Sequence, residues 1–98
     1  MLSVVRTDQA ETDLAEILDY LEERNPHAAE RLATAIDDRC SLLGQLPQMG
    51  RTREELGPGL RSVVVEPYVL FYRVTAAAVE VLRILHGARD IDTIMKAD

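Results

Sequence analysis

The sequence predicts an α+β fold in which an antiparallel sheet packs against an αα-hairpin. Three observations lead to this: a short apolar run opens the chain, two stretches with apolar residues at helical spacing follow, and three strand-like runs then come in close succession. The element order is β-α-α-β-β-β. We expect a single domain over residues 1–98, with a strand and helical hairpin in 1–46, a loop in 47–59, a three-stranded meander in 60–90, and a short tail or helix in 91–98.

The N-terminal half predicts one strand and two helices. Residues 2–6 (Leu-Ser-Val-Val-Arg) are typical of a short strand, and Asp8 precedes Glu11 at the spacing of a capping box. Apolar residues then follow a helical stripe as far as Leu21. Asn25-Pro26 ends the first helix and begins the second, because proline is tolerated at a first helical position but not inside a helix. Gly44 and Pro47 are expected to stop the second helix.

The C-terminal half predicts strands at about 60–66, 69–75 and 78–85. The turns at Pro67-Tyr68 and Ala76-Ala77 are so short that they fit only antiparallel hairpins. Alternation of side chains along each strand then sorts the meander into two faces. One face holds Val63, Val65, Val69, Phe71, Val79, Val81 and Leu85, interrupted by Arg61, Arg73 and Arg83, and the other holds Val64, Leu70, Tyr72, Val74, Leu82 and Ile84. Two helices cover one face only, so we expect a twin subunit, a partner peptide or the chain's own C-terminus on the other.

Composition indicates an ordinary globular protein. Hydrophobic residues make up 47% and charged residues 29%, which excludes wholesale disorder. The single Cys40 leaves no intramolecular disulfide or thiolate cluster, so a reducing, cytoplasmic location is the default expectation. No metal site and no cofactor are predicted. The N-terminus lacks the apolar run of a signal peptide, and no segment approaches the roughly 18 apolar residues of a membrane span.

Charge is distributed unevenly along the chain. The net charge is −6, and residues 1–46 carry ten acids against four arginines, whereas the remainder has seven acids and seven bases. An acidic protein gains no general attraction to phosphate backbones, so unspecific nucleic-acid binding is disfavoured. Direct sequence-specific nucleic-acid binding is not expected either. Arginines within apolar strands are costly unless paired. Arg61, Arg73 and Arg83 therefore either ladder across the strands, with Glu66 and Glu80 as counter-charges, or grip carboxylates of a partner.

An ordered set of short motifs accompanies this element order. They are Asp13-Leu14 and Tyr20, then Pro47, Gly50-Arg51 and Glu55-Leu56, then Gly59-Leu60-Arg61-Ser62, Tyr72-Arg73-Val74, Ile84-Leu85-His86-Gly87 and Arg89-Asp90. Together they resemble the RelE/ParE superfamily of bacterial toxins from type II toxin–antitoxin modules, and the His-Gly-x-Arg-Asp ending is most similar to the ParE branch. The resemblance implies a small cytoplasmic protein neutralised by a cognate antitoxin whose C-terminal segment wraps it.

The same resemblance implies one of two targets. RelE-like members cleave mRNA in the ribosomal A site, and ParE-like members inhibit DNA gyrase and replication. Cleavage without a metal needs a base, an acid and a cation, for which Arg61, Arg73, Arg83 and His86 are the available residues. However, Val69 stands where a strand arginine of the nuclease branch would fit, and Lys96 is the only lysine.

The sequence therefore favours a ParE-like gyrase inhibitor with no catalytic residues. A ribosome-dependent mRNA endonuclease and a non-toxic remnant that only binds antitoxin are the alternatives. We expect a homodimer or a heterotetramer with antitoxin as possible assemblies, and we expect His86 to be either structural or functional. The residues expected to bind antitoxin are Tyr20, Arg61, Phe71, Arg73 and Arg83, and those expected to bind the target are His86, Arg89 and Asp90.

Overall fold

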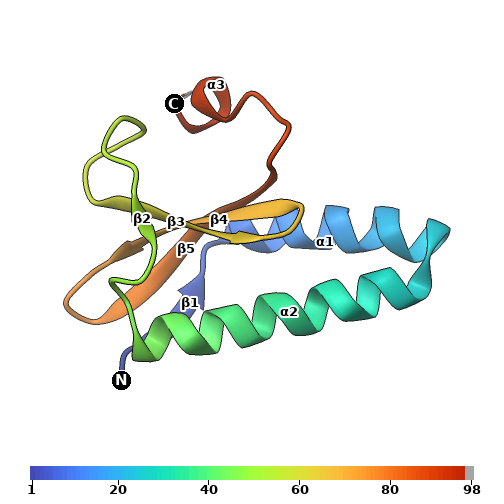
Figure 1. Ribbon diagram of the computed structural model, residues 1–98, viewed down its shortest axis with the longest axis horizontal. Helices are drawn as coiled ribbons and strands as arrows, with labels where there is room; N and C mark the ends of the chain where they lie inside the picture. The colour runs from blue at the N-terminus through green and yellow to red at the C-terminus, as the bar shows by residue number, and fades with distance from the viewer. Residues whose placement is uncertain (97–98) are drawn as a thin grey trace.

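The computed structural model describes residues 1–96 and has helices on both sides of one central sheet (Figure 1). The strands form a five-stranded sheet in the order β1-β5-β4-β3-β2. The predicted α+β fold, with its helical hairpin, strand meander and C-terminal helix, is confirmed. The elements are β1 (Ser3–Arg6), α1 (Asp8–Arg24), α2 (Pro26–Gln45), β2 (Arg51–Thr52), β3 (Leu60–Val65), β4 (Tyr68–Val74), β5 (Ala78–His86) and α3 (Ile91–Lys96).

The sheet is mixed, so the prediction of a purely antiparallel sheet is wrong for its first strand. β1 pairs with β5 in parallel, from Ser3 opposite Ala78 to Arg6 opposite Val81. No tight turn joins these two strands, because the helical hairpin and the rest of the sheet lie between them in sequence. The structure also adds a short strand inside the expected loop. β2 pairs antiparallel with β3, and its flanking glycines and prolines conceal it in the sequence.

Specific side chains at the helix ends determine where α1 and α2 begin and end. Thr7, one residue before the expected cap, accepts a hydrogen bond from the Ala10 amide at 3.2 Å and begins α1. Asn25 ends α1 and also caps α2 by accepting from the Ala28 amide at 3.2 Å, which confirms the predicted break. Gly44 does not stop α2, which runs on to Gln45. Its missing side chain instead lets the segment before β1 pass closely, and the Leu2 amide donates to the Gly44 carbonyl at 2.9 Å.

Strand register overturns the predicted division into two faces. The β3–β4 turn places Val65 opposite Tyr68, so odd-numbered residues of β3 share a face with even-numbered residues of β4. Val63 therefore lies beside Leu70 and not beside Phe71. A β-bulge then shifts the pairing of β4 with β5: Phe71 lies opposite Arg83, but the next residue, Tyr72, lies opposite Val81. A single parity rule fails because each hairpin has its own register and one of them shifts midway.

The helical hairpin covers one face of the sheet and builds the main core. The buried side chains of this core come from both helices and from β3, β4 and β5. Tyr72 is fully buried in it. Its hydroxyl accepts a hydrogen bond from the Gly50 amide and donates one to the Pro47 carbonyl, both at 2.9 Å. This side chain ties the segment after α2 to the middle of the sheet.

The chain's own C-terminal segment covers the opposite face. A second cluster buries Leu56, Leu60, Phe71 and Leu85, and the partly buried Ile91, Ile94 and Met95 of α3 pack against it. Figure 1 shows α3 on the side of the sheet away from α1 and α2. Of the three covers expected for this face, the C-terminus is the one present in the folded chain. No helix within residues 1–96 has the length and apolarity to cross a bilayer.

Candidate functional site

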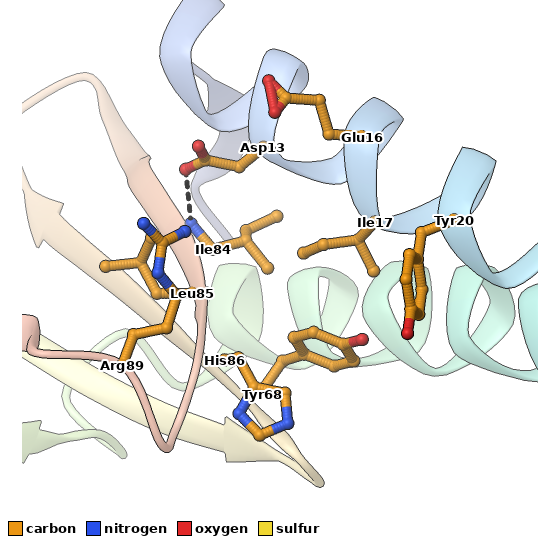
Figure 2. Close-up of a pocket in the computed structure, with 9 residues that line it drawn as sticks. All are labelled: Asp13, Glu16, Ile17, Tyr20, Tyr68, Ile84, Leu85, His86 and Arg89. Atoms are coloured by element: carbon orange, nitrogen blue, oxygen red, sulfur yellow. Dashed lines mark hydrogen bonds between the residues drawn. The ribbon is translucent and has the colours of Figure 1, made fainter.

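A groove of about 560 Å³ lies between α1 and the last residues of β5 (Figure 2). It opens because β1 pairs with β5 only as far as Val81, after which Thr7 turns the chain into α1. Within residues 1–96, the final part of β5 therefore has no neighbouring strand on that edge. The residues lining this α1–β5 groove are Asp13, Glu16, Ile17 and Tyr20 from α1, Tyr68 from β4, Ile84, Leu85 and His86 from β5, and Arg89.

Asp13 joins the two walls at one end of the groove. Its carboxylate accepts hydrogen bonds from Nε and Nη2 of Arg83, at 2.8 and 3.1 Å, and from the backbone amide of Ile84 at 3.0 Å. The Asp13 side chain is only 9% exposed and that of Arg83 24% exposed. The hydrogen bond to Asp13 raises the pKa of Arg83 above its usual value. This ion pair fixes α1 against the strand and neutralises both charges.

Aromatic side chains form the floor and far wall of the groove. Tyr68 packs edge-on against the His86 ring, with centroids 5.4 Å apart. Burial raises the pKa of Tyr68, so its hydroxyl stays protonated at neutral pH. Tyr20 is 56% exposed and is steadied from behind by the Arg24 guanidinium, 3.7 Å above its ring. Figure 2 shows the Tyr20 ring reaching down from α1 toward Tyr68, so two phenols face the same space.

His86 and Arg89 provide hydrogen-bond donors at the mouth of the groove. Nδ1 of His86 accepts a hydrogen bond from the Ala88 amide at 3.0 Å, which assigns the proton of the neutral ring to Nε2. Arg89 forms no ion pair with any residue in 1–96, and its side chain extends back toward the groove in Figure 2. Asp90 instead caps α3 by accepting from the amide and hydroxyl of Thr93, at 3.3 and 2.7 Å.

The three strand arginines do not form a row. Arg61 lies on the helix-covered face and donates to the carbonyls of Gln48 and Gly50, at 3.2 and 2.8 Å. Register turns Arg73 to the opposite face, where its Nε donates to the Pro58 carbonyl at 3.2 Å. Arg83 is held by Asp13. Glu66 and Glu80 form no ion pair among residues 1–96, so the alternative prediction that they act as counter-charges to these arginines is wrong.

The groove thus brings together Tyr20, His86 and Arg89 from the predicted set and separates them from Arg61 and Arg73. Phe71 is fully buried beneath α3 and the loop before β3. Asp13 and Tyr68 are among the groove residues that sequence reasoning did not assign to a site. Asp13 reads as one more early helix carboxylate, and Tyr68 as part of a turn, so their roles emerge only when α1 lies against β5.

The groove is better suited to binding a polypeptide than to holding a metal. Residues 1–96 contain no group of three His, Cys, Asp or Glu side chains close enough to share a metal ion. What the groove offers is an apolar and aromatic floor, phenol and imidazole donors, and one cation at its mouth. These groups recognise backbone and carboxylate oxygens of a protein partner.

Comparisons with known proteins agree on one family. The family model described as "ParE toxin of type II toxin-antitoxin system, parDE" matches residues 4–91. Toxin RelE2 of Caulobacter vibrioides is 39% identical over 91% of this chain and 99% of its own length. Toxin ParE3 of the same organism is 33% identical over 90% of this chain and 89% of its own length. A solved structure titled "Chromosomal ParDE TA system from P. aeruginosa" superposes with a TM-score of 0.74 and 28% identity, covering 88% of this chain and 96% of that one.

Proposed function

Because this chain belongs to the family of ParE toxins from type II toxin–antitoxin systems, we propose that it acts in the cytoplasm by binding and inhibiting DNA gyrase, without catalysis of its own. Membership confirms the predicted superfamily and implies a cognate antitoxin as partner. The family includes relatives named RelE as well as relatives named ParE. The choice of target therefore rests on the residues of this chain.

The dispersal of the strand arginines is the observation that carries the proposal. A ribonuclease without a metal needs cations that converge on the phosphate where charge develops. Arg61 and Arg73 point to opposite faces and bind backbone carbonyls, and Arg83 is neutralised by Asp13. None of the three is among the residues that line the groove with His86. The positions expected to do phosphate chemistry are instead used to brace the fold.

The α1–β5 groove supplies the contact surface in this proposal. His86 and Arg89 present an Nε2 donor and a guanidinium at its mouth, and we assign both to contact with gyrase. Asp90 supports them indirectly, because it caps the helix that follows Arg89. Tyr20 and Tyr68 extend the same surface along α1. Such a surface can inhibit a protein target by binding it, without catalysing a reaction.

Two purified reactions test the proposal. In a supercoiling reaction with gyrase, ATP and relaxed plasmid, the toxin is expected to suppress supercoiled product, and added antitoxin is expected to restore it. In a translation reaction, mRNA is expected to stay intact. Arg89→Ala should lose the effect on gyrase, whereas Arg31→Ala, an exposed arginine on α2, should keep it. Unimpaired supercoiling in the presence of folded toxin would refute gyrase as the target.

A ribosome-dependent mRNA endonuclease is the second candidate, and one feature favours it. Tyr68, His86 and Arg89 meet in a single groove, and a phenol, an imidazole and a guanidinium can serve as acid, base and cation in RNA cleavage. This function predicts cuts at the ribosomal A site that vanish in His86→Ala. A chain that neither cuts mRNA nor affects gyrase, and does not slow growth without antitoxin, would be a remnant that only binds antitoxin.

A further inference from the structure

The outer edge of β1 carries backbone groups that no strand within residues 1–96 pairs. β1 stands at the end of the strand order, and its inner edge pairs with β5. The Thr7 amide donates inward to the Val81 carbonyl at 3.0 Å. Because alternate residues of a strand in a parallel ladder bond toward the same side, Val5 also bonds inward. The N–H and C=O groups of Val4 and Arg6 therefore point outward, where the described residues offer them no hydrogen-bond partner.

Other open positions along the edges of this sheet are occupied by side chains. Nη1 of Arg39 donates to the Val64 carbonyl of β3 at 2.8 Å. Asp13 accepts from the Ile84 amide of β5 at 3.0 Å. Devices of this kind keep a sheet edge from pairing with another chain. The outer edge of β1 has no such side chain among residues 1–96, and its central residues are two valines, which favour a paired strand.

We propose that this edge joins two copies of the chain, with β1 of one copy antiparallel to β1 of the other across a two-fold axis at Val5. In this register Val4 of each copy lies opposite Arg6 of the other, and each pair exchanges two hydrogen bonds. The outward groups of both edges are then satisfied, and the two sheets become one continuous sheet. The proposal goes beyond the proposed function, because none of the residues that line the α1–β5 groove belongs to β1.

Side-chain alternation places Val5 at the centre of this interface. Val4 packs against the helix-covered core, and Arg6 pairs with Asp37 of α2 at 3.4 Å. Both side chains therefore point to the helix side, and Val5 points to the other side, where it is 47% exposed. The two Val5 residues lie directly opposite each other as a non-hydrogen-bonded pair, with Cα atoms about 4.5 Å apart. Contact between these β-branched side chains removes apolar surface from water.

The surface beside the edge is complementary to an arginine of the second copy. The N-terminal residues lie beside the C-terminal end of α2 (Figure 1), and a hollow of about 560 Å³ between them is lined by residues that include Val4, Asp37 and Gly44. Arg6 of the second copy lies opposite Val4 and so reaches this hollow. There it meets the Asp37 carboxylate, whose side chain is 71% exposed, and the negative end of the α2 dipole. This charge complementarity favours a second copy as the occupant over an acidic peptide.

Cross-linking at position 5 tests the pairing directly. A Cα separation of about 4.5 Å lies within the range of disulfides, so Val5→Cys in a Cys40→Ala background should form a covalent dimer under mild oxidation. Val64→Cys in the same background is the matched control, because Val64 is a strand valine of nearly equal exposure, 48%. We expect the Val5→Cys dimer to form at least roughly tenfold faster, since pairing raises the effective concentration of its thiols.

Opposite charges at position 5 test the two-fold relation. Sedimentation of the wild-type toxin is expected to show a dimer with a Kd on the order of 10 µM, because such a short edge buries less than a standard interface. Val5→Glu places two carboxylates face to face and should weaken the dimer at least about tenfold, and Val5→Lys should do the same with two cations. An equimolar mixture of the two variants should restore dimers. Thermal unfolding verifies that each variant is folded.

Three results would each overturn the proposal. They are a wild-type toxin that stays monomeric at about 100 µM, equal rates of cross-linking for Val5→Cys and Val64→Cys, and a dimer that Val5→Glu leaves intact, because such a dimer uses another surface. If Val5→Glu does not fold, the two cysteine variants decide alone. These measurements contain neither gyrase nor antitoxin, so their outcome is independent of the proposed function.

Discussion

Removal of the Asp13 carboxylate is expected to destabilise the fold far more than removal of a neighbouring acid. Within residues 1–96, Asp13 links α1 to β5 through both an ion pair with Arg83 and a hydrogen bond from the Ile84 amide. Asp13→Ala leaves the Arg83 guanidinium and the Ile84 amide without this acceptor. The Arg83 guanidinium then loses its ion-pair partner and keeps only the more distant charge of Glu16, so the free energy of unfolding should fall.

The expected magnitude follows from burial of the two partners. Loss of one member of a fully buried ion pair costs about 3–5 kcal/mol. The Arg83 side chain is 24% exposed, so water recovers part of its solvation, and we expect a loss of about 2 kcal/mol. For a domain of this length each kcal/mol lowers Tm by about 4–8 °C, which gives a decrease of about 8–16 °C.

Urea denaturation followed by circular dichroism measures this loss. Glu16→Ala provides the matched control, because Glu16 is an exposed acid on the same helix, and its effect should stay within about 0.5 kcal/mol. In the double variant Asp13→Ala/Arg83→Met the unbalanced charge is gone, so part of the loss should be recovered. Equal effects of Asp13→Ala and Glu16→Ala would contradict the role given to this ion pair.

Three further predictions concern buried groups. Tyr72→Phe removes the partner of the Gly50 amide and the Pro47 carbonyl and should cost about 2 kcal/mol in urea denaturation; a loss below about 0.5 kcal/mol would refute this brace. Iodoacetamide should alkylate Cys40 at least tenfold more slowly in the native protein than in urea, by an order-of-magnitude estimate, because burial shields the thiol and raises its pKa. Burial also raises the pKa values of Tyr68 and Tyr72, so the folded state holds these protons more tightly than the unfolded chain. Stability should therefore fall as pH rises above about 9, and a constant unfolding midpoint between pH 8 and 10.5 would contradict this.

The elements of the fold could be predicted from sequence because their signals are local. Asn25-Pro26 marks the break between the helices, and the short turns dictate the hairpins. The faces of the sheet could not be predicted, because they depend on register. The pairing of Val65 with Tyr68 sets one relation between strands, and the bulge beside Phe71 changes the next. Neither event leaves a mark in the pattern of apolar residues.

The candidate site was predictable only in part, for the same reason. His86 and Arg89 stand out because they follow an apolar strand, and Tyr20 because it lies off the helical stripe. Asp13 and Tyr68 carry no such signal. Their roles come from contacts across 70 residues of sequence in one case and from packing at a turn in the other. The unpaired edge of β5 depends on where β1 stops, which is a property of the assembled sheet.

Titration of gyrase with purified toxin tests most directly the central claim that this chain inhibits by binding. The reaction holds gyrase and relaxed plasmid constant and varies the ratio of toxin to gyrase, while a parallel translation reaction receives the same toxin at substoichiometric amounts. A binding inhibitor should suppress supercoiling progressively and reach its plateau only when toxin is at least equimolar with gyrase, with the mRNA intact. Full supercoiling at all ratios, with many mRNA molecules cut per toxin molecule, would contradict the claim.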